Sequence, residues 1–475
     1  MNKRPLLAAS IALALATSAH AASPEWPQFR GSSLSAVAAA QKPPVEFGPE
    51  KNLLWKVELP SGSSSPVVAG DRIFLTGFHD GQLEVLALSR RDGALLWRKP
   101  VVVKQLETYF QKLGSPAAST CETDGERVVS YFGSFGLLCH DLDGKELWTL
   151  PQPLPQSKDG FGTGTSPILH DGLVYLLRDE DGPGQGLYAI DAKTGKERWR
   201  ASRKDFRVSF GTPVVWDGAL VTLGDTRAKG YDLKTGEERW IVRGLSAYPC
   251  TTPTVGADGH LYIATWSPGT ASEPMPAFND LLGGMDTDKD GKLSKAELAP
   301  TGFKDFFDVN DKNKNGFWER EEWEEGLTWM ARGKNVVLAI KPGGKGDITE
   351  THVPWISEKG APYVSSPLAY EGRLWLAKDG GLLTTYDLAT GKVVIDKQRL
   401  GAAGDYYASP VGADGKVWLG AADGKVLVLK AGDKIEILAT NDLGEALQAT
   451  PAFVENKLYV RTAAHLWAFG NRDAK

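Results

Sequence analysis

Residues 166–199 read SPILHDGLVYLLRDEDGPGQGLYAIDAKTGKERW, and this stretch holds the unit that the rest of the chain repeats. Two short runs rich in branched apolar residues flank Asp171-Gly172, and two more flank Thr194-Gly195. Dipeptides of this kind are typical of tight turns between antiparallel strands. The stretch therefore predicts four strands that are joined by hairpins.

A Ser-Pro or Thr-Pro dipeptide stands before the first apolar run of each unit. The prolines are Pro66, Pro116, Pro167, Pro213, Pro253, Pro367, Pro410 and Pro451. They are about 40 to 50 residues apart, which is the length of a propeller blade, except that one interval is more than twice as long. We predict an all-β fold, an eight-bladed β-propeller with four strands in each blade.

Most units end in a tryptophan, as at Trp97, Trp148, Trp199 and Trp240. A large ring at this point of the fourth strand is expected to pack between neighbouring blades. The last unit has only three strands, and residues 53–57, LLWKV, have the form of the missing fourth. We predict that residues 53–57 pair with residues 466–469 and close the ring; an open stack of sheets is the alternative.

The N-terminus reads as an export signal. Lys3 and Arg4 precede an apolar run at 6–15, and Ala-His-Ala follows at 19–21, so we expect residues 1–21 to be a cleavable signal peptide, with an uncleaved anchor as the alternative. No later run has the roughly 20 apolar residues of a spanning helix. Because no cysteine follows the apolar run, we expect a periplasmic or secreted protein without a lipid anchor that does not span the membrane.

The composition disfavours a nucleic-acid partner and a fold held together by disulfides. The chain has 53 glycines and a net charge of −5, without the basic stripe that nucleic acids require, so no nucleic-acid partner is expected. The cysteines, Cys121, Cys139 and Cys250, are odd in number. The repeat places the first two on the first and third strands of one blade, too far apart for a disulfide. We expect buried free thiols.

The long interval between Pro253 and Pro367 holds an insertion. The β pattern stops after residue 266 and resumes at 335, and the residues between are rich in acidic side chains. We therefore divide the mature chain into a propeller, residues 22–270 and 334–475, and a domain of residues 271–333 inserted in the fifth blade.

The insertion contains two twelve-residue loops of the EF-hand pattern, in which alternate oxygens converge on one hard cation and a glycine allows the bend. Loop one, residues 286–297, reads DTDKDGKLSKAE and offers Asp286, Asp288, Asp290, the carbonyl of Lys292, Ser294 through water, and Glu297. Loop two, residues 311–322, reads DKNKNGFWEREE and offers Asp311, Asn313, Asn315, the carbonyl of Phe317, Glu319 and Glu322. Both loops predict calcium as the cofactor.

The two loops support each other. Leu293 and Trp318 hold the eighth positions, where paired EF-hands form a short β-bridge. The apolar side chains expected to share one core are Phe278, Leu281, Phe303, Phe306, Phe307, Trp323 and Trp329. Four carboxylates in loop one repel one another without a cation, which disfavours the alternative of a purely structural acidic turn. We expect loop one to bind more tightly than loop two, with a Kd on the order of 0.1 to 1 mM for at least one loop.

The unit Ala189, Asp191, Thr194, Gly195 and Trp199 resembles the repeat of PQQ-like β-propellers, and WPQFRG at 26–31 resembles the opening of many secreted members. The resemblance implies one of two functions. Quinoprotein dehydrogenases hold pyrroloquinoline quinone (PQQ) over the funnel and oxidise alcohols or sugars, whereas scaffold propellers of outer-membrane assembly are not catalytic. The adjacent cysteines typical of the alcohol dehydrogenase type are absent from this sequence, so bound PQQ is not favoured.

Residues just before the Ser/Thr-Pro dipeptides are expected at the channel mouth: Tyr109, Phe161, Arg207, Tyr248, Tyr363, Asp405, Tyr406 and Gln448. They form either a site for a protein or another ligand, or mere channel lining and inter-blade packing. The seven histidines form no pattern with Ser and Asp, and no catalytic residue is predicted. We expect a monomeric calcium-binding scaffold or binding protein, with a quinoprotein dehydrogenase as the alternative.

Overall fold

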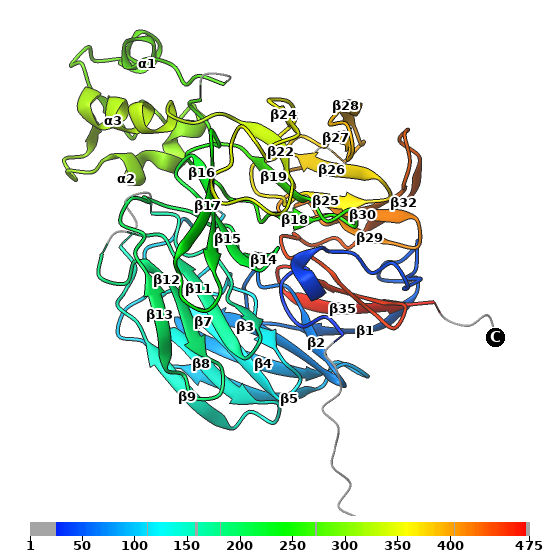
Figure 1. The fold of residues 1–475 in the computed structure, drawn as a ribbon. Coiled ribbons are helices and arrows are strands. Elements are labelled where there is room, and N and C mark those ends of the chain that lie inside the picture. The colour runs from blue at the N-terminus through cyan, green and yellow to red at the C-terminus, as the bar shows by residue number, and fades with distance from the viewer. Residues whose placement is uncertain are drawn as a thin grey trace, which may run out of the picture.

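The structure is a computed structural model that describes residues 25–111, 113–156, 160–180, 182–270, 273–402 and 404–471. Within these residues, eight sheets are arranged as the blades of a β-propeller (Figure 1), seven with four strands and one with a short fifth strand. The predicted eight-bladed all-β fold is confirmed. The predicted signal peptide, residues 1–21, lies outside the described residues.

Each blade contains four antiparallel strands, of which the first lies at the inner edge and the fourth at the outer edge. Blade 1 consists of β2 (Val67–Ala69), β3 (Arg72–His79), β4 (Gln82–Ser89) and β5 (Leu95–Val101); blade 2 of β6 (Glu122–Thr123), β7 (Arg127–Phe132), β8 (Gly136–Asp141) and β9 (Glu146–Pro151). Blade 3 consists of β10 (Ile168–His170), β11 (Leu173–Arg178), β12 (Gly186–Asp191) and β13 (Glu197–Ala201); blade 4 of β14 (Val214–Trp216), β15 (Ala219–Gly224), β16 (Arg227–Asp232) and β17 (Glu238–Arg243).

The second half of the ring repeats this plan. Blade 5 consists of β18 (Thr254–Val255), β19 (Leu261–Thr265), β22 (Val336–Ile340) and β24 (Trp355–Ser357); blade 6 of β25 (Leu368–Tyr370), β26 (Arg373–Lys378), β27 (Leu382–Asp387) and β28 (Val393–Arg399). Blade 7 consists of β29 (Val411–Ala413), β30 (Lys416–Gly420), β31 (Lys425–Lys430) and β32 (Ile437–Asp442); blade 8 of β33 (Ala452–Val454), β34 (Lys457–Arg461), β35 (His465–Gly470) and β1 (Leu53–Glu58). A short strand β23 (Gly346–Asp347) pairs in parallel with the outer edge of blade 4.

The ring closes as the sequence predicts. Strand β1 pairs antiparallel with β35, with Leu53 opposite Phe469 and Val57 opposite Leu466. The N- and C-terminal strands therefore share one blade, and this pairing joins the first repeat to the last and closes the ring.

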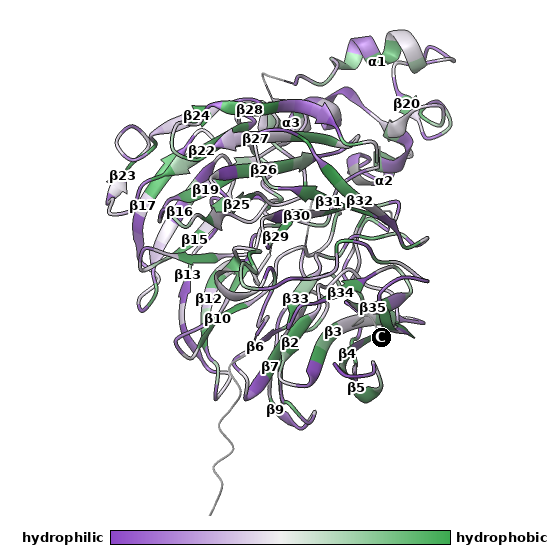
Figure 2. Cartoon of the chain, turned by 90° about the vertical axis from the view of Figure 1, so that its right-hand side faces the viewer, coloured by the Kyte–Doolittle hydropathy of each residue, from purple (hydrophilic) through white to green (hydrophobic). Residues whose placement is uncertain are grey.

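The middle strands of each blade are buried and the outer strand is half-exposed. In blade 3, β12 is almost wholly buried, whereas the outer strand β13 alternates between exposed and half-buried residues. Neighbouring blades cover both faces of the middle strands, so the apolar cores lie between blades rather than within a single layer. In Figure 2 the hydrophobic colour accordingly runs along the strands, and the connecting turns are more hydrophilic.

The Ser/Thr of the repeated dipeptide joins each blade to the next. The backbone N–H of Ser65 donates to the hydroxyl of Thr120 (3.0 Å), and the N–H of Thr120 donates to the hydroxyl of Ser166 (3.0 Å). The same bond recurs between every successive pair of blades and ends with the N–H of Thr450 on the hydroxyl of Ser65 (3.1 Å). Eight hydroxyls thus close a hydrogen-bonded ring around the channel.

This ring corrects one predicted repeat position. The residue of blade 2 that takes the place of Ser65 is Thr120, followed by Cys121 where the other blades have proline. Ser115-Pro116 was the predicted dipeptide, but it lies five residues earlier in a loop. The dipeptide is a misleading marker in blade 2, because the bond between blades requires only the hydroxyl and not the proline.

The tryptophans of the outer strands pack on the turn of the following blade. The indole N–H of Trp148 donates to the carbonyl of Ala192 (2.8 Å), and Trp55, Trp97, Trp199 and Trp355 make the equivalent bond. Trp240 differs from the prediction, because it packs edge-on against Trp216 of its own blade (5.9 Å), and Trp216 instead donates to Gly259 of blade 5 (2.9 Å).

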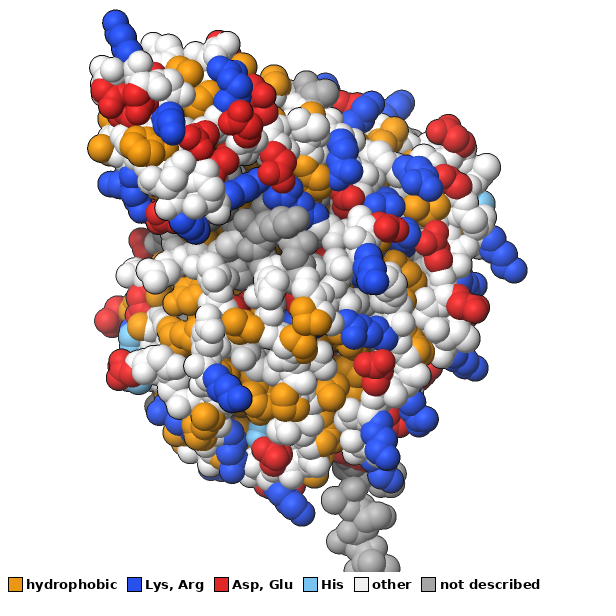
Figure 3. All heavy atoms as spheres, turned by 90° about the vertical axis from the view of Figure 1, so that its left-hand side faces the viewer, with side chains coloured by type: hydrophobic (Ala, Val, Ile, Leu, Met, Phe, Trp, Pro, Cys, Tyr) orange, Lys and Arg blue, Asp and Glu red, His pale blue; other side chains and the backbone are white. Residues whose placement is uncertain are grey.

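The insertion begins after β19, between the second and third strands of blade 5. It contains α1 (Phe278–Met285), β20 (Leu293–Ser294), the 3-10 helix η2 (Gly302–Phe306), α2 (Phe307–Asn310), β21 (Phe317–Trp318) and α3 (Arg320–Met330). Figures 1 and 3 show it as a lobe above the ring, with acidic side chains gathered on its surface.

The segment before β1 bonds to three blades and reaches the channel, where Phe29 lines the cavity. Trp26 pairs with Val68 of blade 1, the N–H of Thr123 in blade 2 donates to Pro27 (2.8 Å), and Ala38 bonds to Gly412 of blade 7 (2.8 Å). The 3-10 helix η1 (Ser32–Leu34) lies in this segment. Among the described residues, no helix is long and apolar enough to cross a membrane.

Candidate calcium loops and the mouth of the channel

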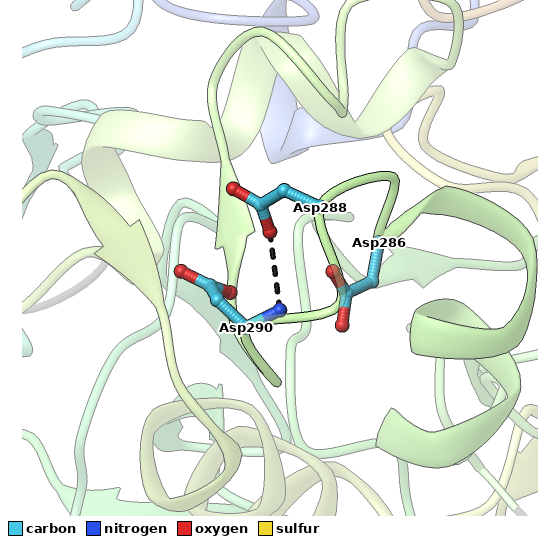
Figure 4. A group of neighbouring side chains, drawn as sticks. All are labelled: Asp286, Asp288 and Asp290. Carbon is cyan, nitrogen blue, oxygen red and sulfur yellow. Dashed lines mark hydrogen bonds between the residues drawn. The ribbon is translucent and has the colours of Figure 1, made fainter.

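The three aspartates of loop one converge. Their carboxylates lie within 4.8 Å of one another, the one such group of metal-ligating side chains found in the described part of the chain (Figure 4). Local bonds hold them: the N–H of Gly291 donates to Asp286 (3.0 Å) and the N–H of Asp290 donates to Asp288 (3.1 Å). Gly291 has a φ of 80°, which the tight bend requires and which glycine adopts without strain.

One oxygen in this group has no protein partner. Oδ1 of Asp286 is buried and accepts no hydrogen bond from the described residues. A buried carboxylate oxygen without a partner is costly unless a cation or water satisfies it. The donor set and this orphaned oxygen therefore fit a hard divalent cation.

Glu297, the last residue of loop one, already faces inward. Its two oxygens accept the backbone N–H groups of Thr287 and Ser294, both at 2.8 Å. These bonds, led by the one from Ser294, lower the pKa of Glu297 to about 2. The backbone N–H of Asp290 favours ionised Asp288, but desolvation and the charges of Asp290, Glu297 and Asp286 outweigh it and raise the pKa of Asp288.

Loop two is more nearly satisfied by its own bonds. The side-chain amides of Asn313 and Asn315 both donate to Glu319 (3.0 Å each), and the ammonium of Lys292 also pairs with Glu319. Glu322 accepts the N–H groups of Lys312 (2.8 Å) and Asn313 (3.2 Å). A cation in loop two must compete with these amide and ammonium donors, which is consistent with the prediction that loop one binds more tightly.

The two loops are joined as expected. Leu293 pairs with Trp318 and Ser294 with Phe317 in a two-stranded antiparallel bridge. The core beneath contains all but one of the predicted apolar residues: Phe278, Leu281, Phe307 and Trp323 are buried, and Phe303 and Phe306 pack against them. Trp329 is the exception, because it contacts Tyr248 of the propeller (4.8 Å between ring centroids).

Two cavities meet at the mouth of the channel. The channel cavity has a volume of about 200 Å³ and is lined by the ring hydroxyls, with Phe29 among the other lining residues. A second cavity of about 300 Å³, which we call the aromatic cleft, lies between the insertion and the mouth. Phe161 and Tyr363 line both.

Comparisons with known proteins agree with this geometry. A family model described as outer membrane protein assembly factor BamB matches residues 45–159 and 83–249. BamB of Alkalilimnicola ehrlichii is 27% identical over 200 residues, which are 42% of this chain and 44% of that protein. BamB from Moraxella catarrhalis superposes with a TM-score of 0.54 at 14% identity, over 88% of this chain and 99% of that one. The chain is thus a β-propeller whose repeats are similar to those of the BamB family over residues 45–249.

Other relatives carry the same fold on different proteins. The serine/threonine-protein kinase AfsK of Streptomyces griseus is 32% identical over 103 residues, 21% of this chain and 12% of the kinase. Quinohemoprotein alcohol dehydrogenase from Comamonas testosteroni superposes with a TM-score of 0.54 at 13% identity, over 95% of this chain and 82% of that one. The matches to the two curated relatives span less than half of their lengths. The structural likenesses show the propeller fold alone.

The predicted mouth residues of this propeller mostly line the cavities. Phe161, Tyr363 and Gln448 line the channel, Arg207 and Tyr248 line the aromatic cleft, and Tyr109 lines a further cavity beside Gln448. Two predictions were wrong. Tyr406 is buried and donates to Ala402 (3.1 Å), and Asp405 lines neither the channel nor the cleft; the neighbouring Tyr407 faces the channel instead.

Sequence reasoning missed the aromatic residues that the insertion brings to the mouth. Phe306 stacks on Phe110 (5.3 Å) and Trp329 meets Tyr248, contacts between segments nearly 200 and 80 residues apart in the chain. It also missed Cys250, which lines the channel. All three cysteines are free thiols, as predicted, with Cys121 and Cys139 buried; burial raises the pKa of each to about 12.

Glu107 is a buried carboxyl near the mouth that sequence reasoning also missed. It is 4% exposed and accepts a hydrogen bond from the hydroxyl of Thr163 (2.6 Å). Burial, aided by the charge of Glu180, raises its pKa to about 7, against the opposing effects of Thr163 and Arg178. Folding raises the pKa of Glu107, so the folded protein holds this proton more tightly than the unfolded chain does. The resulting contribution to the free energy of unfolding is fully present below about pH 4.5 and is lost as the pH rises through 7.

We predict that Glu107→Gln stabilises the protein at pH 8 but not at pH 4.5. Glutamine has nearly the shape of the protonated acid and cannot ionise. The free energy of unfolding of the variant should therefore exceed that of the wild type by about 3 kcal/mol at pH 8, as follows from the rise in the pKa of Glu107 from 4.5 to about 7. Urea unfolding at the two pH values measures the difference. An equal effect of the substitution at both pH values would show that the charge of Glu107 is not responsible.

Proposed function

We propose that this chain is a calcium-binding propeller of the cell envelope that acts as a scaffold or binding protein. The observation that carries the calcium part is loop one, in which three carboxylates converge and Asp286 keeps a buried oxygen without a partner. The relatives named as outer membrane protein assembly factors support an envelope location and a protein partner. We propose periplasmic or secreted placement, with the insertion as a calcium-stabilised lobe beside the channel mouth.

The scaffold function is preferred because, among the described residues, no aspartate, glutamate or histidine lines the channel cavity or the aromatic cleft to act as an acid or base on a substrate there. Glu107 does not change this assessment, because the cavity that it lines, of about 30 Å³, has room for about one water molecule and not for a substrate.

A quinoprotein dehydrogenase remains the second candidate, since a quinohemoprotein alcohol dehydrogenase shares the propeller fold. PQQ is an anionic quinone with carboxylate groups, and the described residues that line the channel cavity include no Arg or Lys to balance them. The lining therefore does not fit PQQ well. Reconstitution with PQQ and calcium followed by dye-linked oxidation of alcohols and sugars decides between the two functions: stoichiometric binding with turnover would establish the enzyme.

The calcium proposal has its own test. Calorimetric titration of the full chain with calcium should show binding, with loop one saturating first. Removing calcium with a chelator should increase hydrogen exchange in residues 278–330, because the carboxylates of the loops then repel one another, while strands β2 to β17 keep their protection. A heat-silent titration at millimolar calcium, with exchange that a chelator does not alter, would refute calcium binding.

A further inference from the structure

The aromatic cleft is formed jointly by two parts of the chain that are remote in sequence. Phe161, Tyr248 and Tyr363 come from the mouth of the propeller, and Phe303, Phe306 and Trp329 come from the insertion. The cavity, of about 300 Å³, lies within the range of small-ligand pockets in proteins and, like them, is mostly apolar with a few polar groups.

Contacts with neighbouring rings and with Asp225 fix the orientation of the rings that line the cavity. Phe306 stacks on Phe110 with 20° between the ring planes, and Phe161 meets Phe110 edge-on (5.6 Å, 74°). Trp329 meets Tyr248 edge-on (4.8 Å, 67°), and its indole N–H donates to Asp225 (3.1 Å). Rings that are already held in place lose little freedom when they contact a further ring, and aromatic pairs prefer these stacked and edge-on arrangements.

The two cationic side chains at the cleft already contact other side chains of the protein. The guanidinium of Arg207 lies over the ring of Trp329 (4.6 Å), and Lys312 pairs with Glu325 (2.9 Å). Among the described residues, no carboxylate lines the cleft. A cationic ligand therefore finds no counter-charge in the cleft, which favours an uncharged ligand over a cation.

Tyr363 supplies a polar group where the cleft meets the channel cavity. It lines both the cleft and the channel cavity, and its ring packs against Trp266 (5.2 Å, 67°). Its hydroxyl makes no hydrogen bond to the described residues. Burial raises the pKa of Tyr363 well above 10, so the hydroxyl stays protonated and can donate.

We propose that the aromatic cleft binds an uncharged planar aromatic ligand that carries a carbonyl oxygen. The ligand ring lies among Phe161, Phe306 and Trp329, and its oxygen accepts a hydrogen bond from the hydroxyl of Tyr363. This site is separate from the calcium loops, and its occupancy does not depend on the scaffold function proposed above.

Three probes of nearly equal size test the two parts of this proposal. 2-Acetylnaphthalene is planar and has the carbonyl, 2-ethylnaphthalene is planar without it, and 1-adamantyl methyl ketone has the carbonyl on a saturated cage. In calorimetric titrations of the full chain in calcium buffer, we expect 2-acetylnaphthalene to bind about 3- to 10-fold more tightly than either of the other two. Equal affinity for the adamantyl ketone, or no binding of any probe, would overturn the proposal.

Removing the hydroxyl of Tyr363 tests whether it binds the carbonyl oxygen of the ligand. Tyr363→Phe keeps the ring against Trp266 and should weaken 2-acetylnaphthalene by about 3- to 10-fold while leaving 2-ethylnaphthalene unchanged. Tyr109→Phe is the matched control, because Tyr109 lines a different cavity at the mouth, and it should change neither affinity. If Tyr363→Phe weakens both naphthalenes alike, or neither, the hydroxyl does not bind the carbonyl and the proposed pose is wrong.

Discussion

Replacing Glu297 by glutamine should weaken calcium binding at loop one by roughly 10- to 100-fold, because the twelfth position supplies two of the oxygens that surround the ion. In the structure both carboxylate oxygens of Glu297 already face the loop, held by Thr287 and Ser294. Glutamine offers one oxygen and no charge, so the variant loses both a ligand atom and part of the attraction. Calorimetry on the full chain should show the tighter phase shifting to higher calcium.

Two other substitutions show whether this loss is local. Glu322→Gln makes the same change in loop two, where Asn313, Asn315 and Lys292 already satisfy much of the acidic charge, and should affect only the weaker phase. Glu324→Gln removes one charge from the exposed face of α3, where Glu324 pairs with Arg320. If Glu324→Gln weakens calcium as much as Glu297→Gln, the effect is general electrostatics and the assignment of Glu297 is wrong.

The ring could be predicted because each repeat carries its own join to the next. The hydroxyl before each inner strand accepts a hydrogen bond from a backbone N–H of the preceding blade, and the tryptophan of the outer strand donates to a backbone carbonyl of the following blade. These positions therefore recur at fixed spacing. The prediction was wrong at two positions where the bond between blades is made without the residues of the repeat motif. Thr120-Cys121 performs the function of Ser-Pro, and Trp216 replaces Trp240 as the donor to the next blade.

The cation loop could be predicted because all of its ligands lie within twelve consecutive residues. The aromatic cleft could not, since Phe161, Phe306, Trp329 and Tyr363 come together only when the insertion folds back on the mouth. The sequence also does not show which of two adjacent loop residues faces the channel. Tyr406 and Tyr407 are adjacent and chemically alike, and only the path of the backbone decides that Tyr407 faces the channel.

We expect Gly195→Ala to destabilise the propeller by about 3 kcal/mol, from two causes that add. Gly195 has a φ of 70°, which costs a residue with a Cβ about 1 kcal/mol or more. A Cβ at this position would also lie 2.7 Å from the indole of Trp148, whose N–H is bonded to Ala192 and cannot shift freely. Urea unfolding, with tryptophan fluorescence as the signal, measures the loss.

Gly172→Ala separates the two causes. Gly172 lies in the same blade with a φ of 74°, but a Cβ there would meet no atom within 4 Å. This control should lose only the backbone cost, about 1 to 2 kcal/mol. In a Trp148→Ala background the ring is gone, so Gly195→Ala should fall to the same value as Gly172→Ala, and the difference is the energy of the ring contact. If both glycine variants cost the same in the wild-type background, the tryptophan of one blade does not clamp the turn of the next. The glycine of the repeat would then be required for backbone geometry alone.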